Sequence, residues 1–359
     1  MDTRLRCSIA MCSLLLLLAV VFTSAYATPI NIRADWNVSD ILSSPTPAVA
    51  LGQWLSGSSN PDPFPSPATT TSTYPLTSKA QPVPLAADIK QTIMNKTIMY
   101  SGAAYCPSVE AGKWTCGLYC EANPDFVLSY SGGDGNFQQR FFVGWNPTSK
   151  EIVVARQGSN FSNFFTLLYD FDFRPTKLNA EATKVFSRLP NSTRADLPQI
   201  PIGPLGKPRL APTGTSLADD AIVNMGFQTA WSRTYADIKK QVKAQLKAHP
   251  DAVRIFVTGH SLGAAIGTLD GIALRSVVPT SIQIEVSGLG QPRLGNPVFA
   301  ALLDRLAQTP SENFVYHRVT HYADIVPHLF PQIMGYQHAY VDMAVSARII
   351  LAVMRNLPK

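Results

Sequence analysis

The hydrophobic pattern of the C-terminal half alternates between short apolar runs and helical periodicity. In one helical segment Ile238, Val242 and Leu246 recur four residues apart, which is the spacing of a single helix face. Strands that alternate with helices predict crossover connections and a mostly parallel sheet, and continuous apolar runs predict that both faces of that sheet are buried. The strand-like runs are residues 254–258, 282–286 and 314–320, and the helical segments are residues 232–248, 262–274 and 297–306.

Further strand and helix patterns precede this half. Apolar residues recur at near-helical spacing across residues 87–104, which predicts a helix packed on the surface of a domain. Residues 140–145 and 151–155 are typical of two strands, and Asn146-Pro-Thr-Ser149 between them predicts a hairpin turn. One α/β domain over residues 87–359, with a central, mostly parallel sheet flanked by helices, accounts for all of these elements.

The N-terminus has the three parts of a secretory signal peptide. Arg4 and Arg6 give a basic start, residues 12–22 form an apolar run, and Ala25-Tyr26-Ala27 supplies small residues at the cleavage site. The apolar run is short for a membrane span. We therefore predict that residues 1–27 are a signal peptide and that the protein is secreted and extracellular.

A segment without a core of its own follows. Residues 28–86 are rich in Pro, Ser and Thr and lack apolar periodicity over most of their length, so they are predicted to be a linker or propeptide. Secretion also permits glycosylation, which fits Asn-X-Ser/Thr sequons at Asn37, Asn95, Asn160 and Asn191.

Three cysteines remain after the signal peptide. Cys106, Cys116 and Cys120 lie within fifteen residues, and in an oxidising compartment this predicts one local disulfide and one further thiol. The sequence leaves the pairing open. No His lies near the cluster, so a zinc site is not predicted.

The charge content of the chain excludes several classes of protein. Charged residues make up 15% of the chain, and the net charge of +6 is spread without a dense Lys/Arg block. This disfavours a nucleic-acid partner and excludes coiled-coil and charge-driven disordered classes.

A candidate nucleophile lies between a predicted strand and a predicted helix. Thr258-Gly-His-Ser-Leu-Gly263 contains the pattern G-x-S-x-G, with Ser261 at its centre. A sharp strand-to-helix turn lifts such a serine above the sheet, and side chains at Gly259 and Gly263 would collide with neighbouring backbone. The helix N-terminus also directs free amides at the reaction centre.

A serine hydroxyl needs a histidine base and a carboxylate that orients it, in the chain order Ser, Asp/Glu, His. Asp324 follows a predicted strand, where ligand sites gather in open α/β sheets, so position favours it as the acid. His338 lies in a loop, and position places it ahead of His321 and His328. The other candidates downstream of the serine were Asp270, Glu285, Asp304, Glu312 and His317.

An ordered series of motifs resembles the class 3 lipases. This family comprises fungal-type triacylglycerol lipases and includes mono- and diacylglycerol lipases and feruloyl esterases. The resemblance covers about residues 95–345 and implies an α/β-hydrolase fold, with Ser261, Asp324 and His338 as the catalytic triad. Its motifs are Glu151-Ile-Val-Val154 leading to Gly158-Ser159, Gly226-Phe227, Thr258 to Gly263, Gly290-Gln-Pro-Arg-Leu-Gly-Asn296, Ala323-Asp-Ile-Val-Pro-His328 and Gly335-Tyr-Gln-His338.

The tetrahedral intermediate of ester cleavage needs hydrogen-bond donors for its oxyanion. The residue after the nucleophile, Leu262, supplies a backbone N–H. The resemblance implies that Ser159 supplies the second donor. Here the sequence departs from the family pattern Arg-Gly-Thr/Ser, because Gln157 precedes Gly158 and the arginine, Arg156, stands one place early.

An apolar segment follows the second oxyanion position, where this family carries its lid. Phe161, Phe164, Phe165 and Leu168 are the residues that we expect to cover an apolar acyl groove in water and to face lipid when the lid opens. A buried core strand or helix is the alternative for this segment.

These observations predict a secreted serine hydrolase of carboxylic esters, most simply a lipase that acts at an oil–water or membrane interface. The chemistry requires no metal and no organic cofactor, and the sequence indicates no obligate protein partner. A feruloyl or other soluble-ester esterase is the alternative within the enzyme class. An inactive lipid-binding relative is the alternative outside it.

Overall fold

The computed structural model describes residues 93–135, 137–159, 174–190, 216–320, 324–330, 334–339 and 343–344. The chain divides into two units, Met1–Lys79 and Ala80–Lys359, and every described residue belongs to the second. Several predictions therefore lie outside the described residues: the signal peptide at 1–27, the segment at 28–86, the sequons at Asn37, Asn160 and Asn191, and the lid residues Phe161, Phe164, Phe165 and Leu168.

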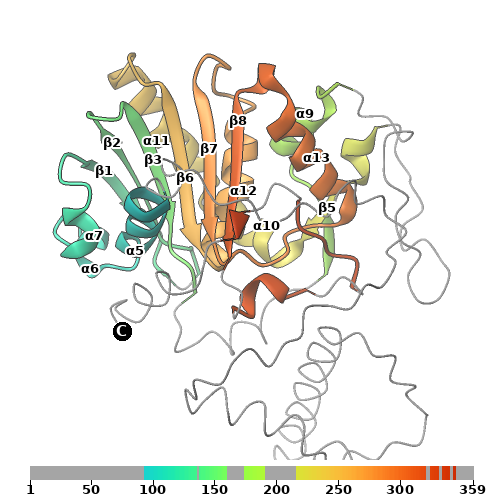
Figure 1. Cartoon of the computed structure of the whole chain (residues 1–359), viewed down its shortest axis with the longest axis horizontal. Coiled ribbons are helices and arrows are strands. Elements are labelled where there is room, and N and C mark those ends of the chain that lie inside the picture. The colour runs from blue at the N-terminus through green and yellow to red at the C-terminus, as the bar shows by residue number, and fades with distance from the viewer. Residues whose placement is uncertain are drawn as a thin grey trace, which may run out of the picture. The chain divides into compact units, whose positions relative to one another are not determined.

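A seven-stranded sheet forms the centre of this unit, in the order β1-β2-β3-β6-β7-β8-β9 (Figure 1). From β3 to β9 neighbouring strands are parallel, which confirms the prediction from alternating strands and helices. At the other edge β1, β2 and β3 pair antiparallel, and the predicted hairpin turn joins β2 to β3. The strands are β1 (Val127–Gly132), β2 (Phe141–Asn146), β3 (Glu151–Arg156), β6 (Arg254–His260), β7 (Gln283–Leu289), β8 (Phe314–Thr320) and β9 (Met343–Ala344).

Helices cover both faces of this sheet. On one side lie η1 (Ile93–Ile98), α5 (Met99–Ala103), α6 (Pro107–Glu110) and α7 (Leu118–Glu121). The other side carries α9 (Ala180–Ser187), α10 (Met225–Ser232), α11 (Tyr235–Ala248), α12 (Leu262–Leu274) and α13 (Pro297–Gln308). Short helices η4 (Leu217–Asp220), η5 (Pro310–Glu312) and η6 (Val326–His328) and a two-stranded sheet of β4 (Pro175–Lys177) and β5 (Ile222–Asn224) complete the described elements.

Two hydrophobic cores lie on the two faces. Successive residues of β2 divide between them: Phe141 and Val143 pack in the larger core with α9 to α13, whereas Phe142 packs in the smaller core with α5 to α7. Side chains of a strand point alternately to opposite faces. Both faces are therefore buried, and this is why the central strands are apolar without alternation.

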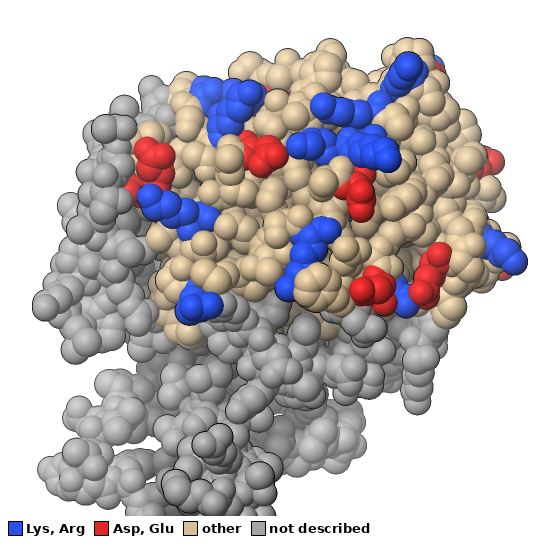
Figure 2. Space-filling view, turned by 180° about the vertical axis from the view of Figure 1, so that it is seen from behind, with Lys and Arg blue, Asp and Glu red and all other residues tan. Residues whose placement is uncertain are grey.

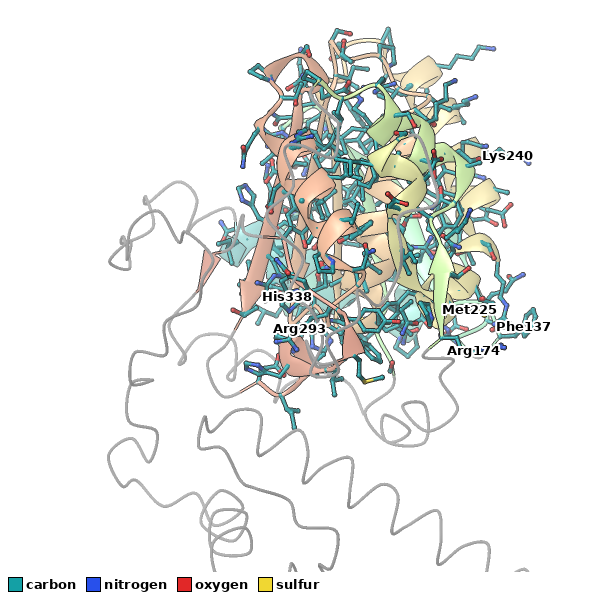
Figure 3. The ribbon with its side chains drawn as sticks, turned by 90° about the vertical axis from the view of Figure 1, so that its right-hand side faces the viewer. Phe137, Arg174, Met225, Lys240, Arg293 and His338 are labelled. Atoms are coloured by element: carbon teal, nitrogen blue, oxygen red, sulfur yellow. A yellow bond between two sulfur atoms is a disulfide. The ribbon has the colours of Figure 1, made fainter. Side chains whose placement is uncertain are left out.

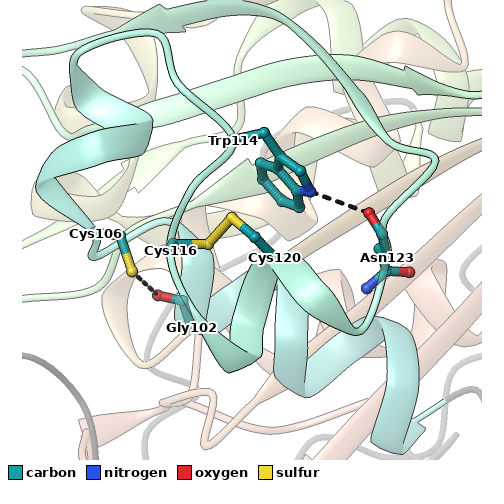
Figure 4. Close-up of a disulfide and its surroundings, with 6 residues drawn as sticks. All are labelled: Gly102, Cys106, Trp114, Cys116, Cys120 and Asn123. Atoms are coloured by element: carbon teal, nitrogen blue, oxygen red, sulfur yellow. Dashed lines mark hydrogen bonds between the residues drawn. A yellow bond between two sulfur atoms is a disulfide. The ribbon is translucent and has the colours of Figure 1, made fainter.

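The predicted local disulfide is present. Cys116 pairs with Cys120 at the start of α7, and Cys106 remains a buried thiol whose Sγ lies 3.8 Å from the Gly102 carbonyl oxygen (Figure 4). Burial raises the pKa of the Cys106 thiol. Trp114 Nε1 donates to the Asn123 carbonyl across this small subdomain at 3.0 Å.

Charge is distributed over the surface, as the sequence indicates. On the face shown in Figure 2, basic side chains are interspersed with acidic ones. Asn95, the sequon residue that the structure describes, is exposed. Within the described ranges, no helix is both long enough and apolar enough to cross a bilayer.

Candidate active site

Ser261 stands alone between β6 and α12 in a strained backbone conformation. Its φ is 56° and its ψ is −122°, a region that non-glycine residues rarely adopt and that costs of order 1–3 kcal/mol. The Ser261 amide donates to the Leu289 carbonyl at 2.9 Å, which ties the turn to the end of the neighbouring strand β7. The fold maintains this strain at the C-terminal edge of the sheet, where the serine side chain leaves the strand.

The two glycines of the turn are there for steric reasons. A Cβ on Gly259 would stand 2.5 Å from the Gly263 carbonyl carbon, and one on Gly263 would stand 2.6 Å from the carbonyl oxygens of residues 156 and 157. The predicted collision with backbone is confirmed at both positions. The close approach at Gly263 also shows that the first turn of α12 packs directly on the segment that follows β3.

Ser159 reaches the same edge through strand pairing. Arg156 of β3 pairs with Gly259 of β6 in parallel register, so the residues that follow both strands emerge side by side. The Ser159 hydroxyl is buried and has no hydrogen-bond partner among the described residues. Leu262 is the first residue of α12, where backbone amides lack an intrahelical acceptor.

Asp324 lies beside the same turn. Its Oδ1 accepts a hydrogen bond from the Val326 amide at 2.9 Å. Its Oδ2 lies 2.7 Å from the position that a Cβ on Gly290 would occupy, and His260 Nε2 lies 3.8 Å from that position. Gly290 has a φ of +56°, so both its conformation and the carboxylate above it favour glycine. The carboxylate is thus close to the residue that precedes Ser261.

His338 is held by a neighbouring carbonyl. Its Nε2 donates to the Pro327 carbonyl oxygen at 2.8 Å. Among the described residues the ring makes this hydrogen bond and none to Ser261 or Asp324. Burial, with the positive charge of Arg318 second, lowers the pKa of His338 to about 3, so the imidazole is neutral at pH 7 and has a basic nitrogen.

The segment 290–296 connects the acid and the base to the rest of the site. The Gln291 side-chain oxygen accepts from Thr268 of α12 at 2.9 Å and from Tyr316 of β8 at 3.2 Å. The family motif by itself assigns no task to these residues. Its task is to anchor the connection after β7 to the helix that follows Ser261.

Two more members of this motif hold the loops of the base. Arg293 donates to the His328 carbonyl at 2.7 Å, and the Gly295 carbonyl accepts from the Gln337 amide at 2.8 Å. Arg293 and His338 lie at the same end of the molecule (Figure 3), and the Arg293 charge contributes to the lowered pKa of His338. The motif therefore positions the segments on both sides of the imidazole.

Arg156, which departs from the family spacing, forms a buried ion pair under the site. Its guanidinium donates to Asp270 of α12 through Nε at 2.5 Å and Nη2 at 2.8 Å, and to Thr234 through Nη1 at 2.6 Å. Both charged side chains are fully buried. Burial raises the pKa of Asp270, whereas the Arg156 charge lowers it. Asp270 is therefore the structural partner of Arg156, and the position of Asp324 after β8 still favours Asp324 as the acid.

No group of three or more His, Cys, Asp or Glu side chains within the described ranges is arranged to hold a metal ion. The polar groups on the segments that follow these parallel strands are two hydroxyls, one carboxylate, one neutral imidazole and the free amides of a helix N-terminus, a set of groups that suits acyl transfer.

The parallel sheet, the strained serine between β6 and α12, and the acid and base loops after β8 define an α/β-hydrolase. The family described as "Lipase (class 3)" matches residues 153–334, about half of the chain, and the protein belongs to this family. The family resemblance predicted from the motifs is confirmed.

Several relatives are similar to this chain. The secreted mono- and diacylglycerol lipase MDL2 of Malassezia globosa is 31% identical over 214 residues, which cover 60% of this chain and 58% of the relative. A lipase of Rhizopus niveus is 36% identical over 124 residues, covering 34% of this chain and 30% of the relative. The chain thus spans less than two thirds of the length of both relatives.

Solved structures show the same fold. Lipase II from Rhizopus niveus has a TM-score of 0.54 at 25% identity, covering 72% of this chain and 82% of that one. The lipase from Rhizopus microsporus var. chinensis has a TM-score of 0.54 at 27% identity, covering 74% of this chain and 76% of that one.

Proposed function

We propose that this protein is a secreted lipase that hydrolyses acylglycerol esters through Ser261, His338 and Asp324. The observation that carries the proposal is the strained Ser261 at the end of β6, at the sheet edge where the Ser159 hydroxyl is buried without a hydrogen-bond partner among the described residues. Strain of this kind persists only where the surrounding fold maintains it, and it gathers at sites of chemistry. Membership of the class 3 lipase family supports the same conclusion.

The reaction proceeds through an acyl-enzyme. Ser261 Oγ attacks the ester carbonyl carbon, and its proton passes to Nε2 of His338, while Asp324 orients the ring and stabilises the imidazolium. The carbonyl oxygen becomes an oxyanion, which the Ser159 hydroxyl and the Leu262 amide stabilise. Collapse breaks the bond to the alcohol, which leaves with the proton from His338. Water then repeats the sequence on the acyl-enzyme and releases the fatty acid.

This sequence requires His338 to leave the Pro327 carbonyl. The resting ring carries its one proton on Nε2, so its rotation away from Pro327 is accompanied by transfer of that proton to Nδ1 through water. Nε2 can then accept from Ser261 while Nδ1 donates to Asp324. The imidazole is already neutral, so no proton has to be removed before it acts as a base. The hydrogen bonds of Arg293 and of the Gln337 amide fix the backbone on either side, so the movement is confined to the ring.

The proposed substrate is a mono- or diacylglycerol presented at a lipid surface. The similarity to secreted mono- and diacylglycerol lipases of Malassezia globosa supports this choice. The predicted lid at Phe161, Phe164, Phe165 and Leu168 gives the means to bind an apolar interface. We also propose that residues 1–27 direct secretion, that residues 28–86 are a linker or propeptide, and that the catalytic domain occupies residues 87–359.

Ser261→Ala tests the mechanism. We expect turnover to fall by about 10⁴-fold or more, because removal of a nucleophile from such a unit abolishes its catalysis. His338→Gln should cause a loss of similar size. The Ser261 hydroxyl makes no hydrogen bond to another described residue. The thermal unfolding midpoint of Ser261→Ala should therefore stay near that of the wild type. Hydrolysis retained in Ser261→Ala would refute the mechanism.

A panel of mono-, di- and triacylglycerols with methyl ferulate identifies the substrate class, read by release of acid at constant pH. Acylglycerol hydrolysis that rises at an oil–water interface supports a lipase. Preference for dissolved methyl ferulate would favour a soluble-ester esterase. A wild-type protein that neither hydrolyses the panel nor reacts with a fluorophosphonate at Ser261 would be a lipid-binding relative.

A further inference from the structure

The hydroxyl of Tyr105 lies between the two segments that carry the proposed oxyanion donors. Tyr105 follows the C-terminal end of α5, on the opposite face of the sheet from α12. Its phenolic oxygen is 2.9 Å from Nδ1 of His260, and it also packs directly against Gly158, where a Cβ would overlap it. One oxygen atom thus contacts the residue before Ser159 and the residue before Ser261.

Both groups of this hydrogen bond are uncharged at neutral pH. Burial lowers the pKa of His260 to about 4, so the ring is neutral at pH 7. Burial raises the pKa of the Tyr105 phenol, so the phenol keeps its proton. The tautomer of His260 sets the direction: with Nδ1 unprotonated, the phenol donates its proton to Nδ1. One side chain thus hydrogen-bonds to the turn and packs against the loop that bears Ser159.

Gly158 shows how closely this hydroxyl is packed. A Cβ at position 158 would overlap both the Tyr105 hydroxyl oxygen and the His260 carbonyl oxygen. The segment that bears Ser159 is therefore pressed against the turn that bears Leu262. Gln139 also holds this segment, with Nε2 donating to the carbonyl oxygens of residues 157 and 158 at 2.6 and 2.8 Å, but it makes no bond to the turn.

We propose that Tyr105 is a positioning residue that sets the separation of the two oxyanion donors, Ser159 and Leu262. The inference rests on the proposed ester hydrolysis and adds a residue that the motifs do not mark. An oxyanion hole works only when both donors stand about 2.7–3.1 Å from the oxygen, and misplacement by about 1 Å can cost roughly 100-fold in rate. Because Tyr105 contacts both segments, it constrains the distance between the Ser159 hydroxyl and the Leu262 amide.

Tyr105→Phe tests the proposal, with Tyr100→Phe as the matched control. Tyr100 is a buried tyrosine of α5 whose hydroxyl accepts from the Asn146 side chain at 3.1 Å, away from the serine turn. Both variants remove one hydroxyl and leave its buried hydrogen-bond partner unpaired, so their unfolding midpoints should fall by similar amounts. With a soluble p-nitrophenyl ester, kcat of Tyr105→Phe should fall about 10- to 100-fold with KM unchanged, whereas Tyr100→Phe keeps the wild-type kcat.

Inhibition by an alkyl trifluoromethyl ketone supplies a second measurement. Ser261 adds to its carbonyl carbon, the serine proton goes to His338, and the former carbonyl oxygen becomes an oxyanion in the hole. The inhibition constant of Tyr105→Phe should rise by the same factor by which kcat/KM falls. An unchanged inhibition constant, or equal kcat in Tyr105→Phe and Tyr100→Phe, would overturn the assignment.

Variants of His260 keep the proposal testable if Tyr105→Phe does not fold. Asn presents an acceptor oxygen near the position of Nδ1, so His260→Asn should retain most of kcat, whereas His260→Leu should lose it. In the double variant Tyr105→Phe/His260→Leu the loss should not exceed the larger single loss, because both remove the same bridge. If the kcat losses of the two single variants added up in the double variant, the two residues would not act through one bridge. A wild-type enzyme without esterase activity would refute the proposed function instead, which separates the two failures.

Discussion

At the N-terminal end of the parallel strands four charged side chains form one ion-pair network, whereas at the C-terminal end burial holds two histidines neutral. In the network Glu151 accepts from Lys96 Nζ and Arg254 Nη1, each at 2.8 Å, and Arg254 also pairs with Glu285 at 3.0 Å. Each buried carboxylate here has a cation in contact.

The two histidines at the C-terminal end of the strands are neutral at pH 7 because they are buried. Burial lowers the pKa of His260 to about 4 and that of His338 to about 3. The Ser159 hydroxyl is buried without a partner among the described residues. A neutral imidazole can accept a proton, and an unpartnered hydroxyl can donate to an oxyanion, whereas a paired charge can do neither.

The difference shows how one sheet serves stability at one end and chemistry at the other. Paired charges are satisfied in the resting protein, so their contribution is to the folded state. Unsatisfied polar groups lower stability in the resting protein and gain their partner only during reaction. The Arg156–Asp270 pair is the exception at the site end, and it lies beneath the reacting groups as their support.

Arg156→Met should cause the largest loss of stability. It leaves the fully buried Asp270 carboxylate without its cation, which typically costs about 3–5 kcal/mol, and part of the cost is relieved if the carboxyl takes up a proton. Urea unfolding of the variant measures the loss. Arg156→Met/Asp270→Asn should recover part of it. A loss below about 1 kcal/mol would mean that the pair is not the support that its burial indicates.

Lowering the pH should weaken the fold through His260. Its pKa is about 4 in the folded protein against an ordinary value of 6.5, which applies to the unfolded chain, so between these values the unfolded chain binds more protons. Stability is therefore fully present above about pH 6.5 and is lost as pH falls toward 4, by up to ~3 kcal/mol from this residue. Urea unfolding at several pH values should show a shallower dependence in His260→Asn. If the unfolding free energy changed equally with pH in the wild type and in His260→Asn, the prediction would be wrong.

Glu151→Gln, at the opposite end, should have the smallest effect. Lys96 and Arg254 are partly exposed and can be rehydrated, so we expect a loss of about 1–2 kcal/mol in unfolding free energy. Ester hydrolysis measured at a temperature well below unfolding should remain at the wild-type kcat/KM. A fall in kcat/KM beyond about fivefold would show that the two ends are not separable.

Much of the fold and part of the site could be predicted because local patterns encode them. The predicted helix at 262–274 and the strand at 314–320 match α12 and β8. The steric need for glycine at 259 and 263 and the presence of one local disulfide were also predicted correctly. In contrast β1, which is partly exposed at the sheet edge, and the short strands β4 and β5 have too little apolar periodicity to be predicted.

The supporting contacts of the site join residues far apart in the chain. Arg156 pairs with Asp270 across 114 positions, and Tyr105 bonds to His260 across 155. Such contacts leave no periodic signal, and a family motif marks Gln291 and Arg293 without stating what they hold. Ser261, Asp324, His338, Ser159 and Leu262 remain the proposed catalytic set.

The sequence alone determined the class of fold, the position of the serine turn and the order of the loops, because short-range spacing and apolar periodicity dictate where strands, helices and tight turns form. Only the tertiary structure decided which cysteines pair, what Arg156 supports, that His338 bonds to Pro327 and that Tyr105 bridges two loops. These depend on which buried polar groups satisfy one another, and that is settled when distant segments pack together.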